Sequence, residues 1–208
     1  MTLYQYTDKN AIQLLATQSR RTDITPYELA SVHLEMGKYL AYQIAEEIPL
    51  EDVEISHPQG TAIGKRIQNE KDLLIFTFMR AGVYIGDGIR SLFQNAPYYH
   101  IYSKRGQGIT DEDWTRLELP PLQDKVIILA DSVINTGESM RPVIKQLQME
   151  TPKKIIVACS VMPIETANKM ESEFPDVNFY TIRVSTNSYV GKGKTDTGNR
   201  LFGTFQDD

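Results

Sequence analysis

An acid, two hydroxyl residues and a glycine follow an apolar run in the middle of the chain. The run Val126 to Ala130 ends at Asp131, and the turn after it carries Thr136, Gly137 and Ser139 into a helical pattern. Ligands of open α/β sheets lie outside the carboxyl ends of the strands, and a helix N-terminus there offers free N–H groups to a phosphate. The two hydroxyls can add donors, while the Asp131 carboxylate suits sugar hydroxyls better. The stretch therefore predicts a site for a phosphorylated ribose.

The elements that must hold this turn are indicated by short apolar runs alternating with helical patterns. Continuous apolar runs of this length are typical of strands covered on both faces. The predicted strands are Leu73 to Met79, Tyr98 to Tyr102, Val126 to Ala130, Ile155 to Val161 and Val177 to Val184. The predicted helices between them are Val83 to Phe93, Ser139 to Met149 and Ile164 to Phe174. This alternation predicts right-handed parallel crossovers in an α/β domain.

A further helix is predicted to begin after Thr25, because Thr25, Pro26 and Glu28 form a capping-box pattern ahead of an apolar stripe. Two segments do not fit the alternation. Ser103 to Pro121 is long for a connection, and such loops are usually functional or disordered. The tail from Ser185 to Asp208 is rich in Gly, Lys, Thr and Asn and has no period. We expect a single domain over residues 1–208.

The composition restricts the function classes. The chain has 208 residues, 22 Lys and Arg against 27 Asp and Glu, and a net charge of -5, which disfavours a broad nucleic-acid interface. The single cysteine, Cys159, allows no internal disulfide and no cysteine metal cage. No leader pattern and no run long enough for a membrane span is present. We expect a cytoplasmic protein that binds neither nucleic acid nor membrane.

The stretch around Asp131 resembles the diphosphoribose-binding motif of the phosphoribosyltransferases, which is an apolar strand, one or two acids and a Thr-Gly-x-Ser/Thr turn. Ser132 stands where the second acid is usual, and the uracil phosphoribosyltransferases likewise keep only the first acid. The resemblance implies that 5-phosphoribosyl diphosphate is bound by Asp131, Ser132, Val133, Ile134, Asn135, Thr136, Gly137, Glu138 and Ser139.

Other segments extend this resemblance. Residues 79–82 read Met-Arg-Ala-Gly and are similar to the family's Leu-Arg-Ala-Gly element, which implies that Arg80 clamps the diphosphate through its forked donors. Arg105 lies where a second diphosphate ligand is expected, with Lys104 as the alternative. Residues 57–60, His-Pro-Gln-Gly, are similar to a Thr-Pro-x-Gly turn near the arm through which the family's subunits touch.

The tail resembles the base-binding stretch of the uracil phosphoribosyltransferases. The matching positions are Asp196, Gly198, Arg200, Phe202, Gly203 and Thr204. The positions that depart from it are 192–195, which read Lys-Gly-Lys-Thr instead of Pro-Gly-Leu-Gly, together with Thr197 and Asn199. The resemblance implies that Val190, Thr195, Asp196 and Thr197 hold the base, and that Asp196 also contacts the activated sugar.

This resemblance covers the chain from Pro26 to Thr204 and implies an open, mainly parallel sheet flanked by helices, with 185–208 as a small hood over the base and 103–121 as a flexible active-site loop. It implies transfer of 5-phosphoribosyl from the diphosphate to uracil, with Arg80 and Asp131 catalytic. It further implies Mg²⁺ carried by the diphosphate, with no metal ligand assigned to a protein side chain, and a homodimer or higher oligomer. Two alternatives stay open: the same reaction with another base, and a non-catalytic regulator that senses the sugar or a nucleotide.

Overall fold

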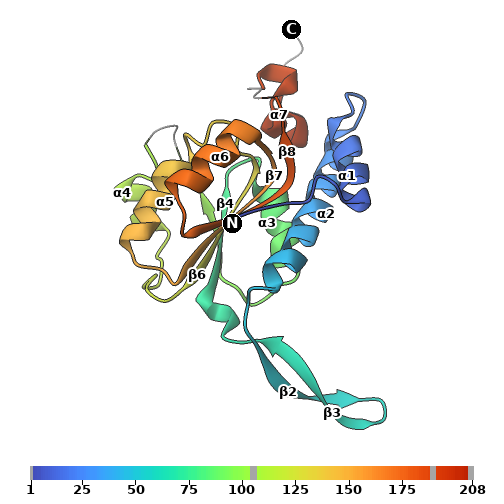
Figure 1. Ribbon diagram of the computed structural model, residues 1–208, viewed down its shortest axis with the longest axis vertical. Helices are drawn as coiled ribbons and strands as arrows, with labels where there is room; N and C mark the ends of the chain where they lie inside the picture. The colour runs from blue at the N-terminus through green and yellow to red at the C-terminus, as the bar shows by residue number, and fades with distance from the viewer. Residues whose placement is uncertain (1, 104–106, 188–190, 206–208) are drawn as a thin grey trace.

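Six parallel strands form the central sheet of the computed structural model, which describes residues 2–103, 107–187 and 191–205 (Figure 1). Along the sheet their order is β1-β8-β7-β6-β4-β5, and every neighbouring pair is parallel. The strands span Leu3–Gln5 (β1), Leu73–Phe78 (β4), Tyr98–Ile101 (β5), Val126–Val133 (β6), Lys154–Pro163 (β7) and Val177–Ser185 (β8). The predicted α/β class with an open, mainly parallel sheet is confirmed.

Helices cover both faces of the sheet, which explains the continuously apolar strands. They are α1 (Asn10–Arg20), α2 (Pro26–Ala45), α3 (Val83–Arg90), α4 (Asp111–Arg116), α5 (Met140–Met149), α6 (Ile164–Glu173) and α7 (Thr197–Phe202), with short 3₁₀ turns η1 (Glu70–Asp72) and η2 (Gly193–Thr195). Apolar residues of α5 and α6 fill the core on one face, and those of α1, α2 and α3 fill it on the other. None of the helices in the described ranges is both long and apolar enough to cross a bilayer.

Helix α2 begins as its sequence predicts and then makes the closest helix contact of the α1–α3 layer. The Thr25 side chain accepts from the Glu28 N–H, and the Glu28 carboxylate accepts from the Thr25 N–H. Further along, α2 crosses α3 at two glycines: a Cβ on Gly37 would lie 2.3 Å from the Ile85 carbonyl oxygen, and one on Gly88 would lie 2.3 Å from the Leu34 carbonyl oxygen. Side chains at these positions would push the helices apart.

An antiparallel hairpin extends away from the sheet. Its strands β2 (Leu50–His57) and β3 (Gly60–Ile67) pair along their whole length, with His57 opposite Gly60 across the turn. Figure 1 shows this arm projecting below the body of the molecule, clear of the helices. Gly60 has a φ of 117°, which favours glycine at the turn. The turn predicted at 57–60 is therefore the tip of an arm.

Several predicted bounds were wrong. Strand β6 does not end before Asp131 but continues to Val133, because Asp131 and Val133 pair with Cys159 and Val161 of β7. The predicted loop over 103–121 contains α4, whose cap is the Thr110 side chain accepting from the Asp113 N–H. The tail without period contains η2 and α7. Strand β1 and helix α1 were not predicted.

Candidate active site

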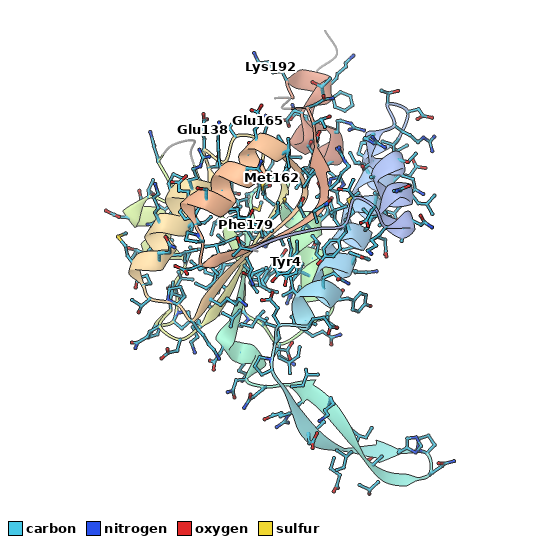
Figure 2. All side chains as sticks on the ribbon, in the orientation of Figure 1. Tyr4, Glu138, Met162, Glu165, Phe179 and Lys192 are labelled. Atoms are coloured by element: carbon cyan, nitrogen blue, oxygen red, sulfur yellow. The ribbon has the colours of Figure 1, made fainter. Side chains whose placement is uncertain are left out.

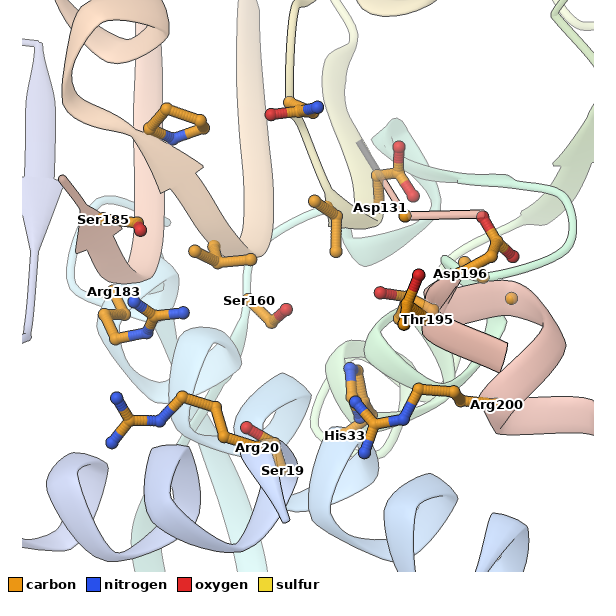
Figure 3. A pocket seen from close by; sticks show the side chains of 18 of the residues that line it. Ser19, Arg20, His33, Asp131, Ser160, Arg183, Ser185, Thr195, Asp196 and Arg200 are labelled. Atoms are coloured by element: carbon orange, nitrogen blue, oxygen red, sulfur yellow. The ribbon is translucent and has the colours of Figure 1, made fainter. Parts of the chain in front are cut away.

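A cavity of about 530 Å³ opens where β6, β7 and β8 end beneath the C-terminal tail. The sheet contributes Asp131, Val133, Ser160, Val161 and Arg183 to its lining, and the tail contributes Gly191 and residues 195–198. Ala81 comes from the turn between β4 and α3. Figure 3 shows Asp131 and Asp196 close together on one side of this cavity. Three segments that the sequence singled out, around 80, 131 and 196, thus meet at one site.

Asp131 lines the cavity, and its backbone belongs to strand β6. Its Oδ1 accepts from the Ser132 N–H at 2.7 Å, and the Ser132 hydroxyl donates to the Ala81 carbonyl oxygen at 2.6 Å. Removal of the carboxyl from bulk water raises the pKa of Asp131 to about 7, against smaller opposing contributions from the Ser132 and Val133 N–H groups. The carboxyl is therefore poised between its neutral and ionised forms near neutral pH.

The turn from Ile134 to Ser139 is fixed to its neighbours at several points. The Ile134 N–H donates to the Val161 carbonyl oxygen at 3.1 Å, and the Thr166 hydroxyl donates to the Asn135 carbonyl oxygen. Gly137 has a φ of 75°, and a Cβ there would also lie 2.9 Å from the Met170 sulfur. The turn is thus held by β7 and α6.

The hydroxyl and carboxylate side chains of this turn face outward. Thr136 and Glu138 are exposed, and the Glu138 N–H is 3.4 Å from the Thr136 hydroxyl oxygen. Figure 2 shows Glu138 at the same end of the molecule as Lys192 of the tail. Of the predicted sugar-phosphate turn, Asp131, Val133 and Asn135 line the cavity, whereas Thr136 to Ser139 lie beside it. The exposure of Thr136 and Glu138 leaves this side of the turn open to a ligand phosphate.

Arg80 is exposed and bonded to the tail. Its Nη1 donates to the Thr204 hydroxyl and its Nη2 to the Asn199 Oδ1, each at 3.2 Å. Its guanidinium carbon lies 5.6 Å from the centre of the Phe202 ring, within range of a cation–π contact. Arg80 therefore fastens α7 to the turn after β4, and it does so with two of its five donors.

The tail is ordered by its own polar side chains. The Asp196 Oδ1 caps α7 by accepting from the Asn199 N–H at 2.8 Å, and the Asn199 amide donates to the Gly193 carbonyl oxygen at 3.2 Å. The Thr195 hydroxyl donates to the Lys192 carbonyl oxygen at 2.7 Å. Thr195, Asp196 and Thr197, which were predicted to hold the base, all line the cavity.

Three predicted ligands, Lys104, Arg105 and Val190, lie outside the described residues. The start of the 103–121 segment does reach the site, since the Ser103 hydroxyl donates to the Ser139 carbonyl oxygen at 3.0 Å.

Residues that the sequence did not point to complete the lining. His33, expected to be structural, is buried in α2 yet forms part of the cavity wall, near Arg200 (Figure 3). Its Nδ1 lies 2.9 Å from the Leu29 carbonyl oxygen, which can only accept, so Nδ1 carries the proton. Burial, with a smaller contribution from the nearby Arg200, lowers the pKa of His33 to about 4, against an opposing contribution from the hydrogen bond to Leu29. Arg20 and Arg183 also line the cavity. Only their spatial neighbours reveal them, because α1 and β8 lie far apart in the sequence.

The carboxylates of the site suit a metal that arrives with its ligand. In the described part of the chain no three His, Cys, Asp or Glu side chains gather closely enough to hold an ion. Asp131 and Asp196 each have one oxygen occupied by a backbone N–H. Mg²⁺ typically takes one or two carboxylates together with substrate phosphate oxygens and water, so this donor set fits an ion whose other ligands come from a diphosphate.

Comparison with known proteins identifies the family of this chain. Residues 6–204 match the family model described as uracil phosphoribosyltransferase. The uracil phosphoribosyltransferase of Dictyoglomus thermophilum is 30% identical over 202 residues, covering 95% of this chain and 97% of that protein. That of Lactococcus lactis subsp. lactis is 30% identical over 211 residues, covering 98% and 100%. The structure of the AQ2163 protein from Aquifex aeolicus has the same fold, with a TM-score of 0.79 and 22% identity over 98% of this chain and 99% of that one. The chain therefore belongs to the uracil phosphoribosyltransferase family.

Proposed function

We propose that this protein is a glycosyltransferase that moves the 5-phosphoribosyl group from 5-phosphoribosyl diphosphate to uracil, giving UMP and pyrophosphate in pyrimidine salvage. The observation that carries the proposal is the meeting of Asp131, Ala81 and residues 195–197 around one cavity in a chain of this family. The sugar would lie against Asp131 and the base against the tail.

In this proposal the sugar phosphate is held by the turn after β6. The 5-phosphate binds the backbone N–H groups and hydroxyls of residues 136–139, ahead of the N-terminus of α5. The ionised Asp131 carboxylate accepts from the ribose hydroxyls through the oxygen not used by the Ser132 N–H. These contacts fix the anomeric carbon opposite the base, and positioning of two bound reactants supplies much of the acceleration.

The chemical step is a displacement at the anomeric carbon. The bond from N1 of uracil to that carbon forms, the bond from the carbon to the diphosphate oxygen breaks, and the N1 proton is released. Negative charge grows on the leaving group, so a preorganised cation stabilises the transition state. We assign this role to Arg80 through its donors not engaged by Asn199 and Thr204, together with Arg105 or Lys104. When carried by the diphosphate, Mg²⁺ would neutralise part of the same charge.

The assembly and location of the protein belong to the same proposal. We expect a homodimer or higher oligomer, since the β2–β3 arm exposes Leu50, Ile55 and Ile63 away from the body of the protein. We expect it in the cytoplasm, acting on small molecules without nucleic acid or membrane. Light scattering coupled to size-exclusion chromatography measures the oligomeric state, and a monomer at working concentration would contradict this part.

The decisive experiment measures UMP formation from radiolabelled uracil, 5-phosphoribosyl diphosphate and Mg²⁺. Cytosine, thiouracil and purines are assayed in parallel, because the tail departs from the family pattern at 192–195, Thr197 and Asn199. Turnover of uracil supports the proposal, and turnover of another base alone replaces uracil as the acceptor. Nucleotide binding without turnover of any base would instead identify a regulator.

A further inference from the structure

Two arginines gather at the end of the cavity opposite the carboxylates. Figure 3 shows Arg20 and Arg183 together on one side and Asp131 and Asp196 on the other. Arg183 belongs to β8, where it pairs with Val161, and Val161 pairs with Val133 of β6. With strands about 4.8 Å apart, the Arg183 backbone lies roughly 10 Å across the sheet from β6. Arg20 is the last residue of α1 and approaches from the helix layer.

Neither guanidinium is neutralised by a side chain of the described residues. The ion pairs found there involve other cations, and the Arg20 Nε donates to the Ala16 carbonyl oxygen at 2.9 Å. Arg183 is only partly exposed, and its burial together with the charge of Arg20 lowers the pKa of Arg183. Both carboxylates that line the cavity lie at its other end. Arg20 is exposed and Arg183 is half-buried, and two like charges placed in this way are stabilised when an anion binds between them.

A plain uracil ring offers these cations carbonyl acceptors but no negative charge. Its edges carry neutral N–H and carbonyl groups, which the tail and Asp131 side of the cavity can already match with threonine hydroxyls and backbone groups. An anion attached to the ring, on the edge away from the nitrogen that receives the sugar, would point across the cavity toward β8. The cavity is continuous between the two ends, so one ligand can reach both.

We propose that Arg20 and Arg183 form an oxyanion subsite that receives an acidic substituent of the base, so that a pyrimidine carrying a carboxylate is an acceptor beside uracil and binds more tightly than uracil. This inference rests on the proposed function, because it places the acceptor base between Asp131 and β8. The same oxyanion chemistry could come from the phosphate of a separate nucleotide, and the experiment below distinguishes the two sources.

The test is calorimetric titration of the full chain with 5-carboxyuracil and with uracil, with ribose 5-phosphate present to occupy the sugar site. The wild type is expected to bind the carboxylated base about tenfold more tightly than uracil. Arg183→Met and Arg20→Met should each remove most of that preference, and Arg183→Lys should retain part of it. Arg21→Met is the matched control: Arg21 is exposed like its neighbour Arg20, but it is paired with Asp23 and does not line the cavity. Equal wild-type affinity for the two bases, or a preference unchanged by both Met variants, overturns the inference.

Two further measurements separate the possible failures. Inorganic phosphate is titrated under the same conditions, and phosphate binding that requires both arginines, without any preference for the carboxylated base, assigns the oxyanion to a separate ligand and overturns the substrate assignment. Turnover is measured independently. Charge-dependent binding of 5-carboxyuracil without turnover of any base would sink the proposed function and leave the subsite standing. Circular dichroism melts verify that each variant is folded.

Discussion

The Arg80 guanidinium donates to the Asn199 side-chain oxygen at 3.2 Å and so joins the turn after β4 to a helix 119 residues later in the chain. The same oxygen accepts from the Thr204 hydroxyl at 3.1 Å, and Thr204 in turn accepts from Arg80. This triangle holds α7 beside the residues around Asp131. Arg80, which we propose binds the diphosphate, is therefore hydrogen-bonded to the tail that we propose binds the base.

Asn199→Ala is expected to lower kcat/KM for uracil about tenfold while changing the free energy of unfolding by less than about 1 kcal/mol, because the lost bonds are exposed. Steady-state kinetics and hydrogen exchange over residues 191–204 measure the two effects. Asn95→Ala is the control, since Asn95 makes a comparable exposed contact with Glu70 far from the cavity. Wild-type kinetics in Asn199→Ala would show that the link has no role in turnover.

Asp131→Asn is expected to lose activity and gain stability. The amide cannot accept from two ribose hydroxyls as strongly as a carboxylate, so kcat/KM should fall about a hundredfold. The wild-type carboxyl has a pKa raised from 3.8 to about 7, so the folded protein retains a proton that the unfolded chain releases. Stability therefore falls as pH rises between about 4 and 7 and is then level.

The variant does not undergo this loss. Its advantage in the free energy of unfolding should therefore be absent near pH 4 and reach on the order of 4 kcal/mol above neutral pH. Urea unfolding of both proteins at the two pH values measures it. Asp176→Asn, an exposed carboxylate elsewhere, serves as the control. An advantage that is the same at both pH values would contradict the raised pKa.

His33 is expected to remain uncharged throughout the physiological range. Its pKa is lowered from 6.5 to about 4. Between these two values the unfolded chain binds a proton that the folded protein does not, so the free energy of unfolding decreases as the pH falls from about 6.5 to about 4. Nitrogen NMR of the ring should show the proton on Nδ1, bonded to the Leu29 carbonyl oxygen, and no titration down to about pH 5. A ring that becomes charged near its ordinary pKa would refute the assignment.

The sheet and the sugar-phosphate turn could be predicted because their signals are local. Apolar runs marked five of the six central strands, and the residues from Asp131 to Ser139 are contiguous. The continuation of β6 to Val133 could not be read from composition, because Asp131 and Ser132 resemble a loop until β7 pairs with them. Helix α7 was missed for a similar reason: its stability comes from the Asp196 cap and the contacts of Arg80 with the tail.

The remaining residues of the cavity lining could not be predicted from the sequence, for a different reason. Arg20, His33 and Arg183 come from α1, α2 and β8, and none of them belongs to a motif. Arg20 ends a helix, Arg183 interrupts an apolar strand, and His33 lies on the buried face of α2. The parallel order of β6, β7 and β8 brings Arg183 to the opening, and the packing of α1 and α2 on the sheet brings Arg20 and His33 there.

Replacement of Gly82 by alanine is expected to lower both stability and activity, because the turn after β4 contacts β6 at this residue. A Cβ on Gly82 would lie 2.6 Å from the Ala130 carbonyl oxygen, 2.8 Å from the Phe78 carbonyl oxygen and 3.0 Å from the Asp131 Cα. All three atoms are backbone and cannot move aside as a side chain can, so Gly82→Ala must displace the turn that carries Arg80. We expect a loss of about 1–3 kcal/mol in the free energy of unfolding.

Activity should fall further than this destabilisation explains, because the displacement separates Ala81 from Asp131. The matched control is Gly64→Ala on the arm, where the nearest atom, 3.3 Å away, belongs to the movable Ile55 side chain and the change should stay within about 0.5 kcal/mol. Denaturant unfolding and kcat/KM, measured on both variants, decide the matter: if Gly82→Ala behaved like Gly64→Ala in both, the contact between the two segments would not set the geometry of the site.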